Sequence, residues 1–156
     1  MEIKHEVRLA EEKDLPSIFK LINELAMYEK APEEVTLTLA QLIEDYRQEL
    51  FIAFVAEQNY MIHGMALIYP IYSTWKGISY YLEDIIVNEQ FRRQGIGGLL
   101  FDEVVKYAKQ KNAARLRWQV LDWNTPGIRF YEKYDAIFEK EWLSYKLTRE
   151  QIALLS

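Results

Sequence analysis

Three of the six glycines fall within four positions, at Gly95, Gly97 and Gly98, and Arg92-Arg93-Gln94 precedes them. They follow an apolar run and open a segment with helical spacing, which is typical of a strand-to-helix turn. Such a turn leaves backbone N–H groups unpaired at the positive end of a helix, where a pyrophosphate binds well. Arg92 and Arg93 add positive charge that the helix end alone lacks. The pattern favours an anionic ligand at this turn, and a plain tight turn is the alternative interpretation.

Two other phosphate-binding motifs do not fit this turn. The sequence has no Gly-x-x-x-x-Gly-Lys-Ser/Thr, so a P-loop that holds ATP is excluded. A dinucleotide fingerprint requires glycine at position 100, where the chain has Leu100. That fingerprint is also expected in the first strand-helix-strand unit of a chain. The anionic ligand is therefore of another kind.

Two adjacent carboxylates, Glu83 and Asp84, lie in the otherwise nearly continuous apolar run from Tyr80 to Val87. Burial in such a strand would raise the pKa of Glu83 and make it a general base near neutral pH. Successive strand side chains point to opposite faces, so Asp84 cannot share this task unless a β-bulge intervenes. The alternative is that the two acids pair with a buried arginine or cap backbone groups.

The net charge limits the kinds of partner that the chain can bind. The chain has 19 Lys and Arg against 24 Asp and Glu, which gives a formal net charge of −5. This sign is wrong for a domain that neutralises phosphates, so no nucleic acid partner is expected. The same sign favours a small cationic substrate, because a negative field raises its local concentration.

Cysteine is absent, and the only histidines are His5 and His63. Disulfides, thiolate metal sites and a cysteine nucleophile are thereby excluded, and no metal is expected. His63 is interpreted as a sheet or surface residue rather than a catalyst. The N-terminus lacks the apolar region of a leader peptide, and no apolar run reaches the roughly 18 residues of a membrane span. We therefore expect a cytoplasmic protein without a membrane partner.

The length of 156 residues fits one domain, expected over 1–156. Hydrophobic spacing predicts the elements in the order βαα, ββ, β, α, β, α, β. Because a helix links the strands 80–87 and 115–120, these two should be parallel. Thr38 and Thr125 are expected to cap their helices. The expected strands are 3–9, 51–57, 61–69, 80–87, 115–120 and 142–147, and the expected helices are 15–25, 39–46, 97–111 and a short one from Thr125.

The motifs resemble those of a known family. Arg92-Arg93-Gln94-Gly95-Ile96-Gly97 is similar to the Arg/Gln-x-x-Gly-x-Gly/Ala signature with which GNAT acetyltransferases bind the pyrophosphate of acetyl-coenzyme A (acetyl-CoA). Asn124-Thr125-Pro126 and Ile128-Arg129-Phe130-Tyr131 resemble the family's asparagine followed by a helix ending in Phe-Tyr. The resemblance implies the α/β GNAT fold, a single-domain mixed and mostly antiparallel sheet with a central splayed parallel strand pair flanked by helices.

Further segments resemble the diamine, or spermidine/spermine, N-acetyltransferase branch of that family. These are Leu25-Ala26-Met27-Tyr28-Glu29, Tyr81-Leu82-Glu83-Asp84 and Asp122-Trp123-Asn124. The resemblance implies that Tyr28, Glu29 and Glu83 bind the amine. It implies that acetyl-CoA is bound by Ile85, Ile86, Val87, Arg92, Arg93, Gln94, Gly95, Ile96, Gly97, Gly98, Asn124, Thr125, Pro126, Gly127 and Tyr131.

The implied reaction is direct acetyl transfer to a primary amine of a diamine, a polyamine or an amine-bearing amino-acid analogue. An alkylammonium with a pKa of about 10.4 must first lose a proton, which Glu83 is expected to accept through water. Tyr131 is expected to protonate the departing thiolate, and the N–H of Val87 to stabilise the oxyanion. The alternatives are a protein amine or an antibiotic as acceptor, and a CoA-binding module without catalysis.

Two further expectations come from the resemblance. It implies a homodimer. It also identifies a departure, because Asp135 stands where the family usually has glycine at a helix end. A left-handed backbone is expected there, which Asp tolerates less well than glycine but better than most residues.

Overall fold

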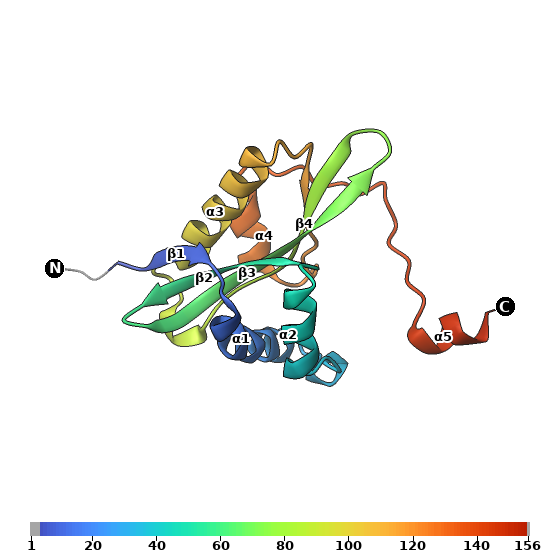
Figure 1. The fold of residues 1–156 in the computed structure, drawn as a ribbon. Helices are drawn as coiled ribbons and strands as arrows, with labels where there is room; N and C mark the ends of the chain where they lie inside the picture. Colours follow the sequence, from blue (N-terminus) through green and yellow to red (C-terminus); the bar gives the residue numbers. More distant parts are fainter. Residues whose placement is uncertain (1–3, 156) are drawn as a thin grey trace. The chain divides into compact units, whose positions relative to one another are not determined.

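The computed structural model describes residues 4–155. The chain divides into two compact units, of which the first ends at Gln119 and the second begins at Val120. The first unit holds a five-stranded sheet in the order β1-β2-β3-β4-β5 (Figure 1). The strands are β1 (Glu6–Leu9), β2 (Ile52–Gln58), β3 (Met61–Ser73), β4 (Gly77–Val87) and β5 (Leu116–Arg117).

The strands pair as the sequence predicted. Strands β1 to β4 are antiparallel to their neighbours, and β4 is parallel to β5. Within the described residues, β5 ends the sheet and pairs only with Tyr80 and Tyr81. From Leu82 onward, β4 therefore has a strand neighbour on one side only.

Helices cover both faces of this sheet. The helices α1 (Leu15–Tyr28) and α2 (Leu39–Arg47) lie on one face and α3 (Ile96–Gln110) on the other (Figure 1). On the first face Ile18 packs in one core cluster with Ile86 of β4. On the second face the ring centroid of Tyr107 lies 5.6 Å from that of Tyr80. As predicted, Thr38 caps α2, accepting a hydrogen bond from the backbone of Gln41.

Two strands are longer than the hydrophobic spacing predicted. The strand expected over 61–69 extends further, because Pro70, predicted to lie in a loop, continues β3 and pairs opposite Tyr80. The turn is confined to residues 73–77, where Gly77 has a φ of 89°. The strand expected over 115–120 is shorter, and residue 3 of the strand expected over 3–9 lies outside the described residues.

The second unit holds α4 (Thr125–Glu132) and α5 (Arg149–Leu154). The predicted cap of α4 is wrong by one residue, because the side chain of Asn124 accepts the N–H of Gly127 at 3.2 Å. Asp135 has a φ of 53°, which confirms the left-handed backbone expected after this helix. α5 was not expected; it begins with a capping box between Thr148 and Gln151.

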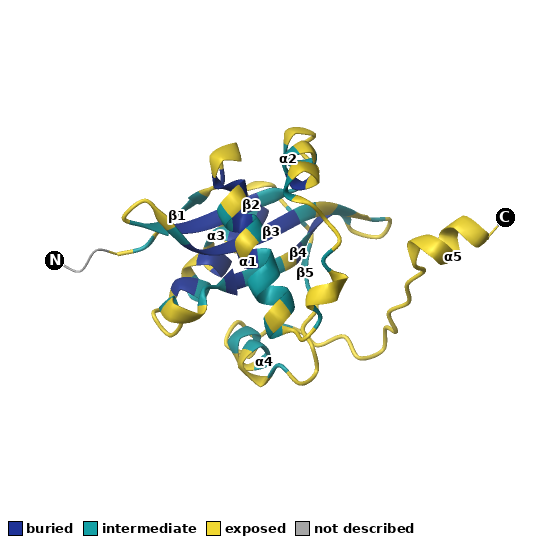
Figure 2. Cartoon of the chain, turned by 90° about the horizontal axis from the view of Figure 1, so that it is seen from below, coloured by how far each residue is buried: buried dark blue, intermediate teal, exposed yellow. Residues whose placement is uncertain are grey.

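The strand predicted at residues 142–147 is wrong. No strand occurs among the described residues of the second unit, and the segment before α5 is exposed (Figure 2). Leu143 and Tyr145, which alternate as in a strand, are 76% and 89% exposed. A strand needs a neighbour for its N–H and C=O groups, and this unit offers none. Within residues 4–155 no helix combines the length and apolar character needed to cross a membrane.

Candidate active site

The C-terminal part of β4 carries backbone groups that point away from its antiparallel neighbour. The N–H of Asn88 donates to the carbonyl of His63 at 2.8 Å, next to the register pair Val87–Gly64. This bond makes Val87–Gly64 a non-hydrogen-bonded pair, so the N–H and C=O of Val87 point away from β3. The same alternation turns Ile85 outward and Ile86 toward β3. The edge of β4 therefore offers backbone groups of Ile85 and Val87 to a ligand.

Asn88 is held at the end of this strand by three groups. Its backbone N–H is bonded to His63, and its side-chain Nδ2 donates to the two carboxylate oxygens of Glu24 at 3.1 and 3.0 Å. Its Oδ1 accepts the N–H of Gln90 at 3.1 Å, which caps a short 3₁₀ helix over Glu89–Phe91. The exit of the chain from β4 toward the glycine-rich turn is thereby fixed.

Arg92 faces the strand and α1 rather than solvent alone. Its Nε donates to the carbonyl of Val87 at 3.1 Å, and its guanidinium lies 5.2 Å from the ring centroid of Tyr28. A cation at this distance is attracted to the ring face. Arg92 thus connects the predicted amine-binding end of α1 with the predicted acetyl-CoA strand.

The glycine-rich turn has the backbone geometry that a pyrophosphate requires. Gly95, the N-cap of α3, has a φ of 77°, and Arg93 has a φ of 64°. The first helical bond runs from Leu99 to the carbonyl of Gly95, so the N–H groups of residues 96–98 lack helical partners. No acidic residue lies in the first turn of α3. These N–H groups, the helix dipole and the arginines suit a bound pyrophosphate.

A β-bulge places two carboxylates on one face of β4. The pairing with β3 skips Glu83 between Leu67 and Ile68. Asp84 pairs opposite Leu67, on the face covered by α1 and α2. Glu83 accepts a 2.9 Å hydrogen bond from the hydroxyl of Tyr69, which packs against that same core. The bulge is the condition under which Asp84 can act together with Glu83.

Glu29, Glu83 and Asp84, called the acidic cluster below, influence one another electrostatically. Burial, together with the charges of Glu83 and Glu29, raises the pKa of Asp84 to about 7. Burial and the charge of Glu83 also raise the pKa of Glu29. Each ionised carboxylate disfavours the ionisation of its neighbours, so a cation among them would relieve the repulsion. The cluster is therefore suited to an ammonium group.

The expectation that Glu83 is buried is wrong. Its side chain is exposed, because it is the extra residue of the bulge. The carboxyl whose pKa is raised by burial belongs to Asp84 instead. Tyr69 was also missed from the sequence, and its pKa is raised by burial and by its hydrogen bond to Glu83.

The remaining predicted residues lie in the second unit. Asn124 caps α4, and a Cβ on Gly127 would lie 2.6 Å from the Asn124 Nδ2, so this turn requires glycine. Tyr131 is half-buried near the end of α4, with its ring centroid 5.2 Å from that of Phe130. The first unit brings together the other predicted groups, namely Tyr28, Glu29, Glu83, residues 85–87 and residues 92–98.

His63 lies in β3, which confirms its prediction as a sheet residue, but it is buried rather than at the surface. It is 4% exposed, and its ring stacks on that of Phe91. Within residues 4–155, no group of three or more His, Asp or Glu side chains is arranged to hold a metal ion.

Comparisons with known proteins identify the family and the fold of the chain. A model of the acetyltransferase (GNAT) family matches residues 15–135. Thialysine N-epsilon-acetyltransferase from Mus musculus is 36% identical over 163 aligned positions, which cover 96% of each chain. Spermidine/spermine N(1)-acetyltransferase-like protein 1 from Homo sapiens is 30% identical over 94% of this chain and 23% of that protein. The fold resembles a crystal structure of an aminoglycoside acetyltransferase from an uncultured soil metagenomic sample, with a TM-score of 0.80 at 20% identity over 94% of this chain and 97% of that one.

Proposed function

The chain belongs to the GNAT family of acetyltransferases, and we propose that it transfers the acetyl group of acetyl-CoA to the primary amine of a small cationic acceptor. GNAT acetyltransferases use acetyl-CoA, and the family match covers most of the chain. The acceptor class follows from the relatives named for thialysine and for spermidine/spermine. We favour an amine-bearing amino-acid analogue such as thialysine over a polyamine, because the thialysine relative is more similar over its full length.

The acidic cluster is the observation that carries this proposal. Burial raises the pKa of Asp84 and of Glu29, and the charge of Glu83 raises both further, so a cation nearby would favour full ionisation of the cluster. An ammonium group bound among Glu29, Glu83 and Asp84 supplies that cation. Tyr28, the last residue of α1 and the neighbour of Glu29, places its ring at the same end of the helix, where it also contacts Arg92. A neutral acceptor would leave the repulsion in place.

The bound ammonium must lose a proton before its nitrogen can attack. Glu83 accepts this proton through water, as its exposed position allows. Asp84, with a pKa of about 7, is partly ionised near neutral pH and offers a second acceptor for this proton. The nitrogen lone pair then forms a bond to the acetyl carbon, and the bond between that carbon and sulfur breaks.

Two groups stabilise the negative charge that develops on the acetyl oxygen and on the departing sulfur. The outward-pointing N–H of Val87 donates to the acetyl oxygen as it becomes negative. Tyr131 donates its hydroxyl proton to the departing thiolate, and the second proton that the nitrogen loses as the amide forms restores the hydroxyl. The chain has no cysteine, so transfer proceeds directly from the thioester without a cysteinyl intermediate.

Backbone and arginine groups hold acetyl-CoA. The backbone of residues 85–87 would hold its pantetheine arm, and Arg93 with the turn of residues 94–98 would hold its pyrophosphate. Arg92 supports this turn through its bond to Val87. We also propose that Asn124, Thr125, Pro126 and Gly127, at the capped start of α4, bind acetyl-CoA.

We also propose that the protein forms a homodimer. The second unit exposes an unusual number of apolar side chains, which a partner subunit would cover. The most exposed are Ile137, Phe138, Tyr145 and Leu154, at 90%, 86%, 89% and 85%. Light scattering should give twice the chain mass, and Tyr145→Glu should shift the protein toward the monomer. A monomeric wild-type protein at working concentration would refute the homodimer.

An amine panel tests the proposed function. Purified protein is incubated with acetyl-CoA and thialysine, lysine, ornithine, putrescine, spermidine or an aminoglycoside, and products are identified by mass spectrometry. Acetylated thialysine is the expected main product. Acetylation of the aminoglycoside alone would replace the acceptor class, and CoA binding without any product would replace the proposed enzyme by a binding module.

A further inference from the structure

His63 lies in β3, where it contacts the start of the glycine-rich turn in two ways. Its carbonyl accepts the N–H of Asn88 at 2.8 Å. Its imidazole stacks on Phe91, with ring centroids 3.5 Å apart and planes only 7° from parallel. Phe91 immediately precedes Arg92 and Arg93. The position of the His63 ring therefore determines where the chain enters the turn.

His63 is paired with the other histidine of the chain. Nε2 of His5, which precedes β1, lies 2.9 Å from Nδ1 of His63. The His5 ring also contacts Phe91 edge-on, with centroids 6.4 Å apart. The Nε2 atom of His63 is buried and has no hydrogen-bond partner among the described residues. Two imidazoles and one phenyl ring thus form a small cluster between β1, β3 and the turn.

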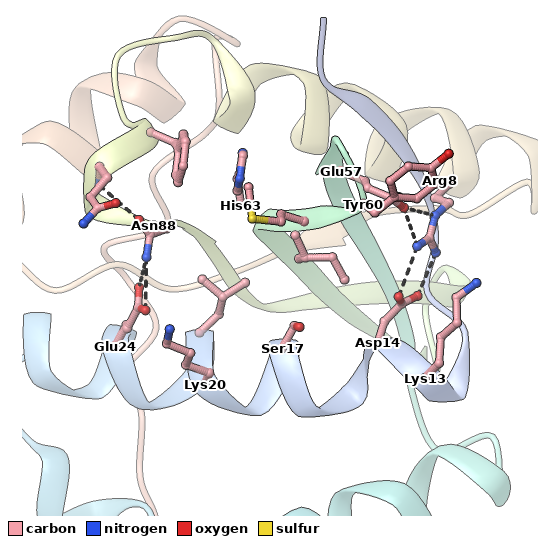
Figure 3. A pocket seen from close by; sticks show the side chains of 15 residues that line it. Arg8, Lys13, Asp14, Ser17, Lys20, Glu24, Glu57, Tyr60, His63 and Asn88 are labelled. Atoms are coloured by element: carbon pink, nitrogen blue, oxygen red, sulfur yellow. Dashed lines mark hydrogen bonds and ion pairs between the residues drawn. The ribbon is translucent and has the colours of Figure 1, made fainter. Parts of the chain in front are cut away.

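The cluster borders a cavity of about 750 Å³ between α1 and the sheet (Figure 3). Arg8 pairs with Asp14 and Glu57 at 2.7 and 2.6 Å. Glu24 is held by Asn88. Lys20 extends from α1 toward the same cavity (Figure 3). The charged or titratable lining groups are Arg8, Lys13, Asp14, Lys20, Glu24, Glu57, Tyr60 and His63.

We propose that His63 is a positioning residue for acetyl-CoA, and that protonation of the His5–His63 pair loosens the glycine-rich turn and weakens CoA binding. The inference rests on the proposed function in one respect, namely that residues 92–98 bind the pyrophosphate. It adds a pH dependence of cofactor affinity that the acetyl-transfer chemistry does not require.

Protonation opposes the packed arrangement for two reasons. Neutral imidazoles share their hydrogen bond as one donor and one acceptor, whereas two imidazolium rings are both donors and repel each other. Burial disfavours the charged form, and it lowers the pKa of both His5 and His63 from the usual value. When the folded state lowers the pKa of a histidine, the neutral ring's contribution to stability is present above the pKa of the unfolded state, about 6.5. It is lost as the pH falls through the pKa of the folded state. The packed arrangement of the two neutral imidazoles is therefore stable at neutral pH and is destabilised by protonation in acid.

Three proteins test this proposal: the wild type, His63→Ala and His63→Phe. The alanine variant removes the ring that supports Phe91, so the dissociation constant for CoA at pH 7.5 should rise about tenfold, or 1.4 kcal/mol. The phenylalanine variant restores the stack and should recover most of that loss. Calorimetry with CoA measures both, and the KM for the amine should stay within about twofold.

The pH profile distinguishes positioning from a structural role. Between pH 7.5 and 5.5 the wild-type affinity for CoA should fall at least about fivefold more than that of His63→Phe, which has no imidazole at this position. His5→Phe, at the half-exposed partner, should flatten the profile in the same way. Equal profiles in the wild type and both variants would overturn the proposal.

A readout without ligand keeps this result separate from the proposed function. Amide hydrogen exchange over residues 88–98 should be faster at pH 5.5 than at pH 7.5, after correction for intrinsic rates, in the wild type but not in His63→Phe. Equal protection in both proteins would overturn the histidine proposal even if CoA binds. Normal histidine-dependent exchange in a protein that binds no CoA would overturn the cofactor site and leave the positioning of the turn established.

Discussion

The hydroxyl of Tyr69 in β3 donates a 2.9 Å hydrogen bond to Oε2 of Glu83, the extra residue of the β-bulge in β4. The bond fixes the exposed carboxylate on the face that carries Asp84. Tyr69→Phe removes the bond and leaves the ring. We expect kcat/KM for the amine to fall about two- to tenfold, because one hydrogen bond contributes roughly 0.5–1.5 kcal/mol. Steady-state kinetics measure this, with the KM for acetyl-CoA as the internal control. A changed KM for acetyl-CoA with unaltered amine kinetics would contradict this role for Tyr69.

Asp84→Asn tests whether the half-buried carboxyl accepts a proton from the amine. Its pKa of about 7 predicts that wild-type kcat/KM for the amine rises through pH 7, as the carboxylate forms. The asparagine variant should lose at least tenfold in kcat at pH 8, with that limb of the profile absent. An unchanged pH profile would remove Asp84 from the proton path.

The same substitution has an opposite effect on stability. A carboxyl with a raised folded pKa favours the protonated state, so ionising it destabilises the fold between its unfolded pKa of about 3.9 and pH 7. Asp84→Asn removes this cost, and its Tm at pH 8 should exceed that of the wild type by about 2–4 °C for each 1 kcal/mol relieved. Calorimetric scans at pH 8 and pH 5 check the sign, since the difference should shrink at pH 5.

The acidic cluster was only partly predictable from the sequence. Glu83 and Asp84 were identifiable, because two acids in an apolar run are unusual. The bulge was not, since it depends on how Leu67 and Ile68 of β3 align with β4. The pairing register decides which of the two acids is half-buried and which is exposed. The raised pKa therefore belongs to Asp84 rather than to the expected Glu83.

The fold was predictable where local signals and tertiary pairing agree. Thr38 and the apolar spacing after it gave α2 correctly, because a helix and its cap are local. The segment at 142–147 alternates as a strand should, but without a neighbour it remains unpaired. The stack of His63 on Phe91 joins residues far apart in the sequence, and no local pattern signals it.

Two substitutions at Arg93 separate the effect of its charge on acetyl-CoA binding from the effect of its backbone conformation on stability. Its φ of 64° is unfavourable for a residue with a Cβ by roughly 1–2 kcal/mol. Arg93→Ala and Arg93→Gly both remove the guanidinium, and both should raise the KM for acetyl-CoA about tenfold. Only the glycine variant also relieves the backbone, so it should be the more stable of the two in urea unfolding. An unchanged KM in both variants would exclude Arg93 from pyrophosphate binding.

Tyr131→Phe tests the proposed general acid. The variant keeps the ring beside Phe130 and loses only the hydroxyl. We expect kcat to fall at least about 100-fold with little change in either KM, because general acids contribute roughly 10²–10⁴-fold. Tyr134→Phe, on the adjacent turn, is the matched control and should retain activity. A wild-type rate in Tyr131→Phe would remove this residue from the mechanism.

The most direct measurement of the central claim is CoA release with thialysine as acceptor, in the wild type and in a Glu29→Gln, Glu83→Gln double variant. Both substitutions are isosteric and remove negative charge from the acidic cluster. The account predicts turnover by the wild type and a loss in kcat/KM for thialysine of at least about 100-fold in the variant, with CoA affinity retained. Equal kcat/KM in the two proteins, or no turnover by the wild type with any cationic amine, would contradict it.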